Sequence, residues 1–160
     1  MMIDFAKYGF NKSHAACYAV VAYQTAWLKY YHPVEYMAAL MTSVIDNTSK
    51  VTQYNMIASR MGIKLMPPDI NAGDTVFAVN DGKIVYALTA IRGVGSKVVS
   101  AIVEEREKNG SYKSLSDFAE RNADNDVSRK VVENMIKAGA FDCFGATRKQ
   151  LMSISDAGFI

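Results

Sequence analysis

The chain has 160 residues, half of them hydrophobic and about a fifth charged, which suits one ordinary domain or two small ones with a real core. Its 18 basic and 16 acidic side chains give a net charge of +2, which excludes intrinsic disorder and a polybasic nucleic-acid tail. The two cysteines, Cys17 and Cys143, lie far apart without a Cys-x-x-Cys or Cys/His cluster. We therefore predict no metal, no disulfide framework and a reducing, cytoplasmic location.

No segment predicts membrane insertion or export. The most apolar stretch, residues 15–28, is shorter than the about 20 mostly apolar residues that a membrane span needs. Lys7 and Lys12 precede this stretch as in a signal peptide, but Asp4 and the Tyr and Trp side chains within the stretch argue against one. We predict a protein without a membrane partner.

Residues 11–31 predict a long helix. Asn11 or Ser13 can cap its start, and neither Gly nor Pro interrupts it before Pro33. The helix is apolar on almost every side, which is typical of a buried helix. A polar stripe nevertheless runs along it, because a rotation of about 100° per residue places on one face the side chains of His14, Tyr18, Val21, Thr25 and Lys29.

Two further helices and an extended connector are expected next. The first runs over residues 33–45 and opens with a proline at its first turn. The second is capped by Thr48 or Ser49 and stops at Gly62. Residues 63–73 contain two adjacent prolines, which exclude a helix there.

A small β-hairpin is predicted where residues 76–79 and 84–87 flank a turn at 80–83, because the glycine in this turn can adopt a positive φ. From residue 88 onward the chain is helical in short pieces, with capping boxes that begin at Ser114 and Thr147. The expected fold class is therefore mainly α with one small β-hairpin, and the natural boundary lies at the proline connector.

The most informative local pattern is the turn Arg92-Gly93-Val94-Gly95-Ser96-Lys97, which joins a short helical turn to an amphipathic helix. Glycines permit φ values closed to other residues and remove side chains that would block a close approach. The first N–H groups of the following helix lack intrahelical partners and carry the positive end of its dipole. With Lys97 adding charge, these groups predict a site for a phosphate oxygen.

This pattern resembles the helix-hairpin-helix motif, whose hairpin binds the nucleic-acid backbone without reading sequence. Apolar residues at helical spacing anchor the turn, namely Leu88, Ile91, Val94, Val98 and Ile102. A purely structural turn between two helices is the alternative. A Rossmann phosphate loop is disfavoured, because it needs a third glycine at position 98 and a strand that feeds the turn directly.

A second, degenerate hairpin follows the helix that is predicted from Ser128. Its turn reads Lys137-Ala138-Gly139-Ala140, and another helix opens at Thr147. Because this turn lacks paired glycines, the pattern favours a structural role over phosphate contact.

Several longer motifs follow one another along the chain in a recognisable order. They are residues 5–19, 23–29, 32–38 and 61–71, the turn at Gly93, and residues 137–142. Together they closely resemble the family C replicative DNA polymerases, the bacterial DNA polymerase III α subunits, over about residues 3–152. The resemblance implies the C-terminal part of the polymerase fingers at 1–62, a connector and β-hairpin at 63–87, and a tandem helix-hairpin-helix DNA-binding region at 88–160.

The resemblance also implies that the start of the first helix lies near the incoming deoxynucleoside triphosphate and the primer-template junction. Lys12 would then offset phosphate charge, while Asn11 and Ser13 would place polar groups at the helix N-terminus. His14 would hydrogen-bond the nucleotide, and Tyr18 lies one turn below it. From the residues alone, Asn11 and Ser13 simply cap the helix and His14 is a surface histidine.

No catalytic residue is predicted in this chain. Two-metal phosphoryl transfer needs clustered carboxylates, and the one Asp-x-Asp sequence, at 124–126, suits a turn. In the family the catalytic aspartates belong to an upstream palm domain. We expect a fragment that is inactive alone, from a nucleotidyltransferase that uses magnesium and works with other replicase subunits. The alternative is a protein-interaction or structural helical module without DNA affinity.

Overall fold

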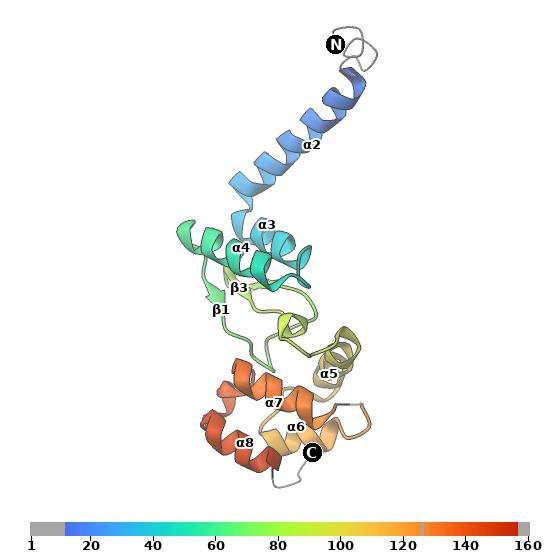
Figure 1. Ribbon diagram of the computed structural model, residues 1–160, viewed down its shortest axis with the longest axis vertical. Coiled ribbons are helices and arrows are strands. Elements are labelled where there is room, and N and C mark those ends of the chain that lie inside the picture. The colour runs from blue at the N-terminus through green and yellow to red at the C-terminus, as the bar shows by residue number, and fades with distance from the viewer. Residues whose placement is uncertain (1–11, 126, 157–160) are drawn as a thin grey trace, which may run out of the picture.

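The computed structural model describes residues 12–125 and 127–156. Over these residues the molecule is elongated, with one helix projecting from a body that is otherwise built of short helices and a small sheet (Figure 1). The helices are α2 (Lys12–Tyr31), α3 (Pro33–Thr42), α4 (Thr48–Arg60), α5 (Ser96–Asn109), α6 (Leu115–Arg121), α7 (Arg129–Ala138) and α8 (Arg148–Asp156). The expected class, mainly α, is confirmed.

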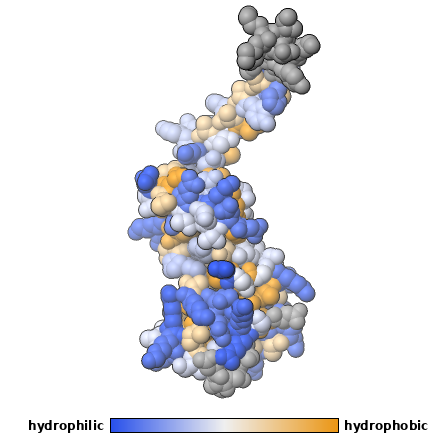
Figure 2. All heavy atoms as spheres, viewed as in Figure 1, coloured by the Kyte–Doolittle hydropathy of each residue, from blue (hydrophilic) through white to orange (hydrophobic). Residues whose placement is uncertain are grey.

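The long first helix is confirmed as α2, but its predicted burial is wrong. None of its residues is buried, and Tyr23 is 70% and Trp27 43% exposed. Helix α2 packs against α3 near its C-terminal end, and the remainder stands away from the body (Figure 1). Apolar residues on every side predict burial only if other elements surround the helix. Figure 2 shows the resulting mixture of apolar and polar patches along α2.

The second and third predicted helices are confirmed as α3 and α4, but α3 ends at Thr42 and not at residue 45, and the capping residue of α4 differs from the prediction. Asn47, and not Thr48 or Ser49, caps α4, because its side-chain oxygen accepts a hydrogen bond from the Lys50 N–H at 3.1 Å. All three are good N-cap residues. The backbone decides between them, since Asn47 has a non-helical φ of −112° and Thr48 is already helical.

The predicted β-hairpin is confirmed, and the sheet has a third strand that the sequence did not predict. Strands β2 (Ala78–Asn80) and β3 (Lys83–Val85) are antiparallel, and Asp81 and Gly82 between them have φ of 49° and 69°. Both central residues of a type I′ turn need such positive φ values. Strand β1 (Leu65–Met66) pairs parallel to β3, so the order is β1-β3-β2. A two-residue strand is too short to show an alternating pattern.

Two clusters of buried apolar side chains lie along the body. The first joins α3 and α4 to the sheet and includes Met41, Ala58 and Ile84. The second joins the helical region from Leu88 to Leu151. Tyr86 packs against both clusters, and a hydrogen bond of 2.8 Å from the Ile70 N–H to the Ala140 carbonyl ties the connector to the second predicted hairpin.

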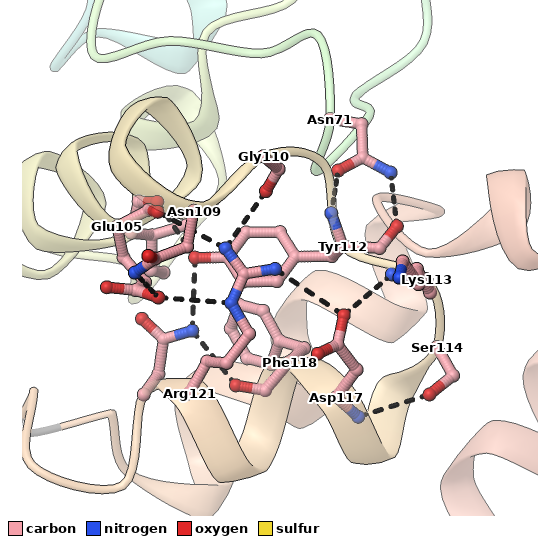
Figure 3. A network of polar contacts seen from close by, with 12 residues as sticks. Asn71, Glu105, Asn109, Gly110, Tyr112, Lys113, Ser114, Asp117, Phe118 and Arg121 are labelled. Atoms are coloured by element: carbon pink, nitrogen blue, oxygen red, sulfur yellow. Dashed lines mark hydrogen bonds and ion pairs between the residues drawn. The ribbon is translucent and has the colours of Figure 1, made fainter.

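The polar network in Figure 3 holds the end of α5 against α6. The Arg121 guanidinium lies 4.3 Å from the centre of the Tyr112 ring, pairs with Glu105 at 3.0 Å and donates to the Gly110 carbonyl at 2.9 Å. Hydrogen bonds from Asn109 and Arg121 lower the pKa of Glu105. This network joins the C-terminal end of α5 to α6.

Replacement of Tyr112 by Phe tests how much this network stabilises the fold. The buried hydroxyl donates to the Ile102 carbonyl at 2.9 Å and accepts from the Asn122 amide at 3.1 Å. We expect Tyr112→Phe to lower the free energy of unfolding by about 1–3 kcal/mol, because it leaves buried polar groups without a partner. Urea denaturation measures this loss.

The matched control is Tyr54→Phe. Tyr54 packs against the first cluster. Its hydroxyl makes no hydrogen bond within residues 12–125 and 127–156. An equal loss of stability in both variants would contradict the role of the network.

Candidate nucleic-acid interface

The turn at Gly93 is anchored to the second buried cluster from both sides. A 3₁₀ turn (Leu88–Ala90) leads into it, and α5 begins directly after it at Ser96. Ile91 and Val94 are only 7% and 6% exposed. The predicted anchoring is confirmed, since Leu88 and Ile102 are also buried and Val98 is partly buried against the same cluster.

Gly93 is required by its backbone and by its surroundings. Its φ is +80°, a conformation that side chains other than glycine rarely adopt. A Cβ at this position would lie 2.7 Å from the Asn134 Nδ2 atom of α7. Sequence reasoning missed Asn134, because no local pattern connects a residue of the second predicted hairpin to the first turn.

Gly95 differs from Gly93, because open space lies over it. Among the described residues, no heavy atom lies within 4 Å of the position that a Cβ on Gly95 would take. Gly95 is the N-cap of α5, with φ −82° and ψ 150°, and it offers no side chain to the first N–H groups of the helix. By contrast, a side chain caps each of α4, α6 and α7, from Asn47, Ser114 and Ser128 respectively. Helix α5 therefore begins without a side-chain cap from its N-cap residue.

The side chains around this opening are exposed and basic. Arg92, Ser96 and Lys97 are all exposed, as are both glycines. The positive end of the α5 dipole adds to the charge of Arg92 and Lys97. Of the six predicted residues of the first hairpin, Val94 is buried and the other five are exposed.

The second predicted hairpin has its turn filled by the protein itself. Helix α7 ends at Gly139, whose φ is +93°. Arg148 pairs with Asp142 at 2.6 Å and donates to the Lys137 carbonyl at 3.1 Å. A Cβ at Gly139 would collide with the Arg148 guanidinium.

The remaining residues of this turn are arranged differently from those of the first. Gly139 and Ala140 are buried and Ala138 is half-buried, whereas the Lys137 side chain is 60% exposed. The glycine of this turn is therefore buried, whereas both glycines of the Gly93 turn are exposed. Of the four predicted residues only Lys137 is exposed, and its ammonium lies 3.5 Å from the Glu133 carboxylate.

The candidates for nucleotide contact lie elsewhere, on α2. Lys12, Ser13, His14 and Tyr18 are exposed near its start, and the His14 and Tyr18 rings meet edge to face with centroids 4.5 Å apart. Asn11 lies outside the described residues. The start of α2 and the turn before α5 are far apart in the molecule (Figure 1), so the two predicted sites are separate.

The described side chains form no cluster that could hold a metal ion. Within residues 12–125 and 127–156, no three His, Cys, Asp or Glu side chains lie close enough together to hold a metal ion. Asp124 lies in a turn, and Asp126 is not among the described residues. Burial raises the pKa of the Cys143 thiol to about 11, which keeps it protonated. None of the described helices is long and apolar enough to cross a membrane.

The helix-hairpin-helix motif family matches residues 62–151, which contain the anchored turn and both predicted hairpins. The chain therefore belongs to the helix-hairpin-helix family. It is similar to DNA polymerase III subunit alpha of Escherichia coli K12, with 50% identity over 96% of this chain. The same protein of Deinococcus radiodurans is 47% identical over 98% of the chain, so the resemblance noted in the sequence is confirmed. The chain spans about 12–13% of the length of these relatives.

Stability measurements on the two glycines test the geometry of the turn. Gly93→Ala should lower the free energy of unfolding by about 1–2 kcal/mol, because alanine is strained at φ +80°. Gly95→Ser should leave stability unchanged or raise it, because serine is a preferred N-cap residue and fits the extended backbone. Equal losses in both variants would show that the two glycines have the same role.

The ion pair in the second turn predicts a pH dependence of stability. The Arg148 hydrogen bond lowers the pKa of Asp142, so this contribution is present above the unfolded pKa and is lost as the pH falls through the folded value. We expect Asp142→Asn to cost at most about 1 kcal/mol at pH 7, since the pair is half exposed. The difference from the unchanged chain should shrink as the pH falls below the usual Asp pKa of about 3.9.

Urea denaturation at a series of pH values measures this difference. Asp124→Asn is the control, because it removes an exposed carboxylate that pairs with no described basic residue. A difference between Asp142→Asn and the unchanged chain that persists at low pH would contradict the assignment.

Proposed function

We propose that this chain holds the DNA backbone for a bacterial replicative DNA polymerase, through the turn at Gly93. The observation that carries the proposal is the start of α5 at Gly95, where no N-cap side chain covers the N–H groups and open space lies above them. Membership in the helix-hairpin-helix family and the similarity to DNA polymerase III subunit alpha support it. The function is then DNA binding within DNA replication.

In this proposal a phosphate oxygen accepts hydrogen bonds from main-chain N–H groups at residues 95–97. Arg92 and Lys97 add positive charge, and Val94 holds the turn against the core. Since these groups meet phosphate and not base edges, binding is independent of DNA sequence. Each neutralised phosphate releases counterions, so affinity falls as salt rises.

The parent protein in this proposal is a DNA-directed DNA polymerase, a nucleotidyltransferase that acts with other replicase subunits. The exposed start of α2, with Lys12, Ser13, His14 and Tyr18, lies near the incoming deoxynucleoside triphosphate in that assembly. Magnesium and the catalytic aspartates are supplied by other parts of the parent. The chain alone is therefore expected to bind DNA without extending a primer.

A second candidate function is supported by the surface of α2. Tyr23, Trp27 and Leu28 are exposed there and line a hollow with Gln24, and exposed apolar surface of this kind marks contacts with other protein. In this alternative the chain is a helical interaction module without DNA affinity. The DNA titration below separates the two candidates.

Fluorescence anisotropy with two 20-base-pair duplexes of unrelated sequence tests the proposed function. We expect equal affinities for both duplexes, with log K falling linearly against log salt by about 0.9 per phosphate contacted. Gly95→Asp should weaken binding by about tenfold or more, because its carboxylate caps α5 and repels phosphate at the same place.

Gly95→Asn is the matched control, since it caps the helix without adding charge. It should bind more strongly than Gly95→Asp while unfolding at a similar urea concentration. If neither substitution changed the affinity for duplex, the Gly93 turn would not be part of the interface. A lack of binding at low salt would favour the protein-interaction module.

A further inference from the structure

Two hollows adjoin at the waist of the molecule, between the sheet and the helical region. One, of about 1040 Å³, is lined by the end of α4 and by the connector, including Arg60, Lys64 and Met66. The other, of about 960 Å³, is lined by Arg92 and by residues of α7, including Lys137. Pro68 and Tyr86 line both hollows, so we treat them together as the waist groove.

The arginines divide into two groups with respect to this groove. Four of the six are bound by the protein itself: Arg106 donates to the Ile70 and Gly73 carbonyls, and Arg121, Arg129 and Arg148 pair with carboxylates. The other two are Arg60 and Arg92, and both line the waist groove. Neither pairs with any acidic side chain in the part of the chain that the structure describes.

The groove combines positive charge with apolar and aromatic surface. Lys64 is exposed on one side, and Lys137 on the other side lies 3.5 Å from Glu133. One acidic side chain, Asp46, is among the described lining residues. Tyr86 stands where the two hollows meet, and its ring packs edge to face on Phe77 with centroids 5.2 Å apart. Burial raises the pKa of the Tyr86 phenol, which keeps the ring neutral.

We propose that the waist groove binds a single strand of DNA next to the turn at Gly93. Arg60, Lys64 and Arg92 meet its phosphates, and an unpaired base stacks on Tyr86. Basic side chains along a groove with an interposed aromatic ring are the features that hold single strands without reading sequence. Within a duplex the bases are stacked on one another and do not reach such a ring. Arg92 belongs to both surfaces, so the single strand continues from the duplex held at the turn.

The proposed function concerns a duplex at the Gly93 turn, whereas the waist groove would bind a single strand. Separate titrations can therefore disprove either one without the other. The probes are a fluorescent 20-nucleotide oligo(dT) and a blunt 20-base-pair duplex, each titrated with the full 160-residue chain. Tyr86→Leu should weaken binding of oligo(dT) about tenfold, whereas Tyr86→Phe retains the ring and should bind as the unchanged chain does. Neither substitution should alter the affinity for blunt duplex.

The charge on the groove is tested independently of Tyr86, which contacts both buried clusters. Arg60→Gln with Lys64→Gln should lower the slope of log K against log salt for oligo(dT) by about 1.4, since each phosphate contact to a single strand contributes about 0.7. Lys50→Gln with Lys149→Gln is the control, as both lysines are exposed and lie outside the groove. This control pair should leave the slope unchanged.

Two results would overturn the inference. One is a failure of oligo(dT) to bind at low salt while blunt duplex binds. The other is an oligo(dT) affinity that the groove substitutions change no more than the Lys50 and Lys149 substitutions do. In either case a loss of duplex affinity in Gly95→Asp would leave the proposed function standing.

Discussion

The burial of Val94 is the constraint on which the arrangement of the interface depends. Because Ile91 and Val94 are held in the second buried cluster, the turn between them and α5 has one orientation relative to the core. Gly93 then faces Asn134 at a positive φ, and Gly95 faces open space. Because Val94 is buried, the residues that follow it at the start of α5 lie at the surface. The network around Arg121 secures the other end of the same helix.

The two predicted hairpins show how the same topology yields different surfaces. Each joins two helices through a glycine with positive φ, at Gly93 and Gly139. In the second, the Arg148 guanidinium lies against Gly139 and binds both Asp142 and the Lys137 carbonyl. The protein thereby satisfies its own polar groups there. Gly95, the N-cap of α5, supplies no side chain of this kind, and among the described residues open space lies over it.

The net charge is close to zero, but the charged side chains differ in whether they are paired within the chain. Several acidic residues are paired with basic side chains of the chain itself, as Glu105 and Asp142 are with arginines. Arg60 and Arg92 have no such role and lie on one groove. A net charge of +2 is therefore compatible with an anionic partner, because main-chain dipoles and a few positioned cations supply the field locally.

The sequence by itself determined the local elements and the turn at Gly93. Helix spacing, glycine positions and capping boxes such as Thr147 with Gln150 depend on neighbours in the chain, and the structure agrees with them. The exposure of α2, the parallel pairing of β1 with β3 and the approach of Asn134 to Gly93 were decided only by the tertiary structure. These features depend on contacts between residues distant in sequence, which no local period encodes. The waist groove belongs to the same class, because α4, the connector, the turn and α7 each contribute only part of its lining.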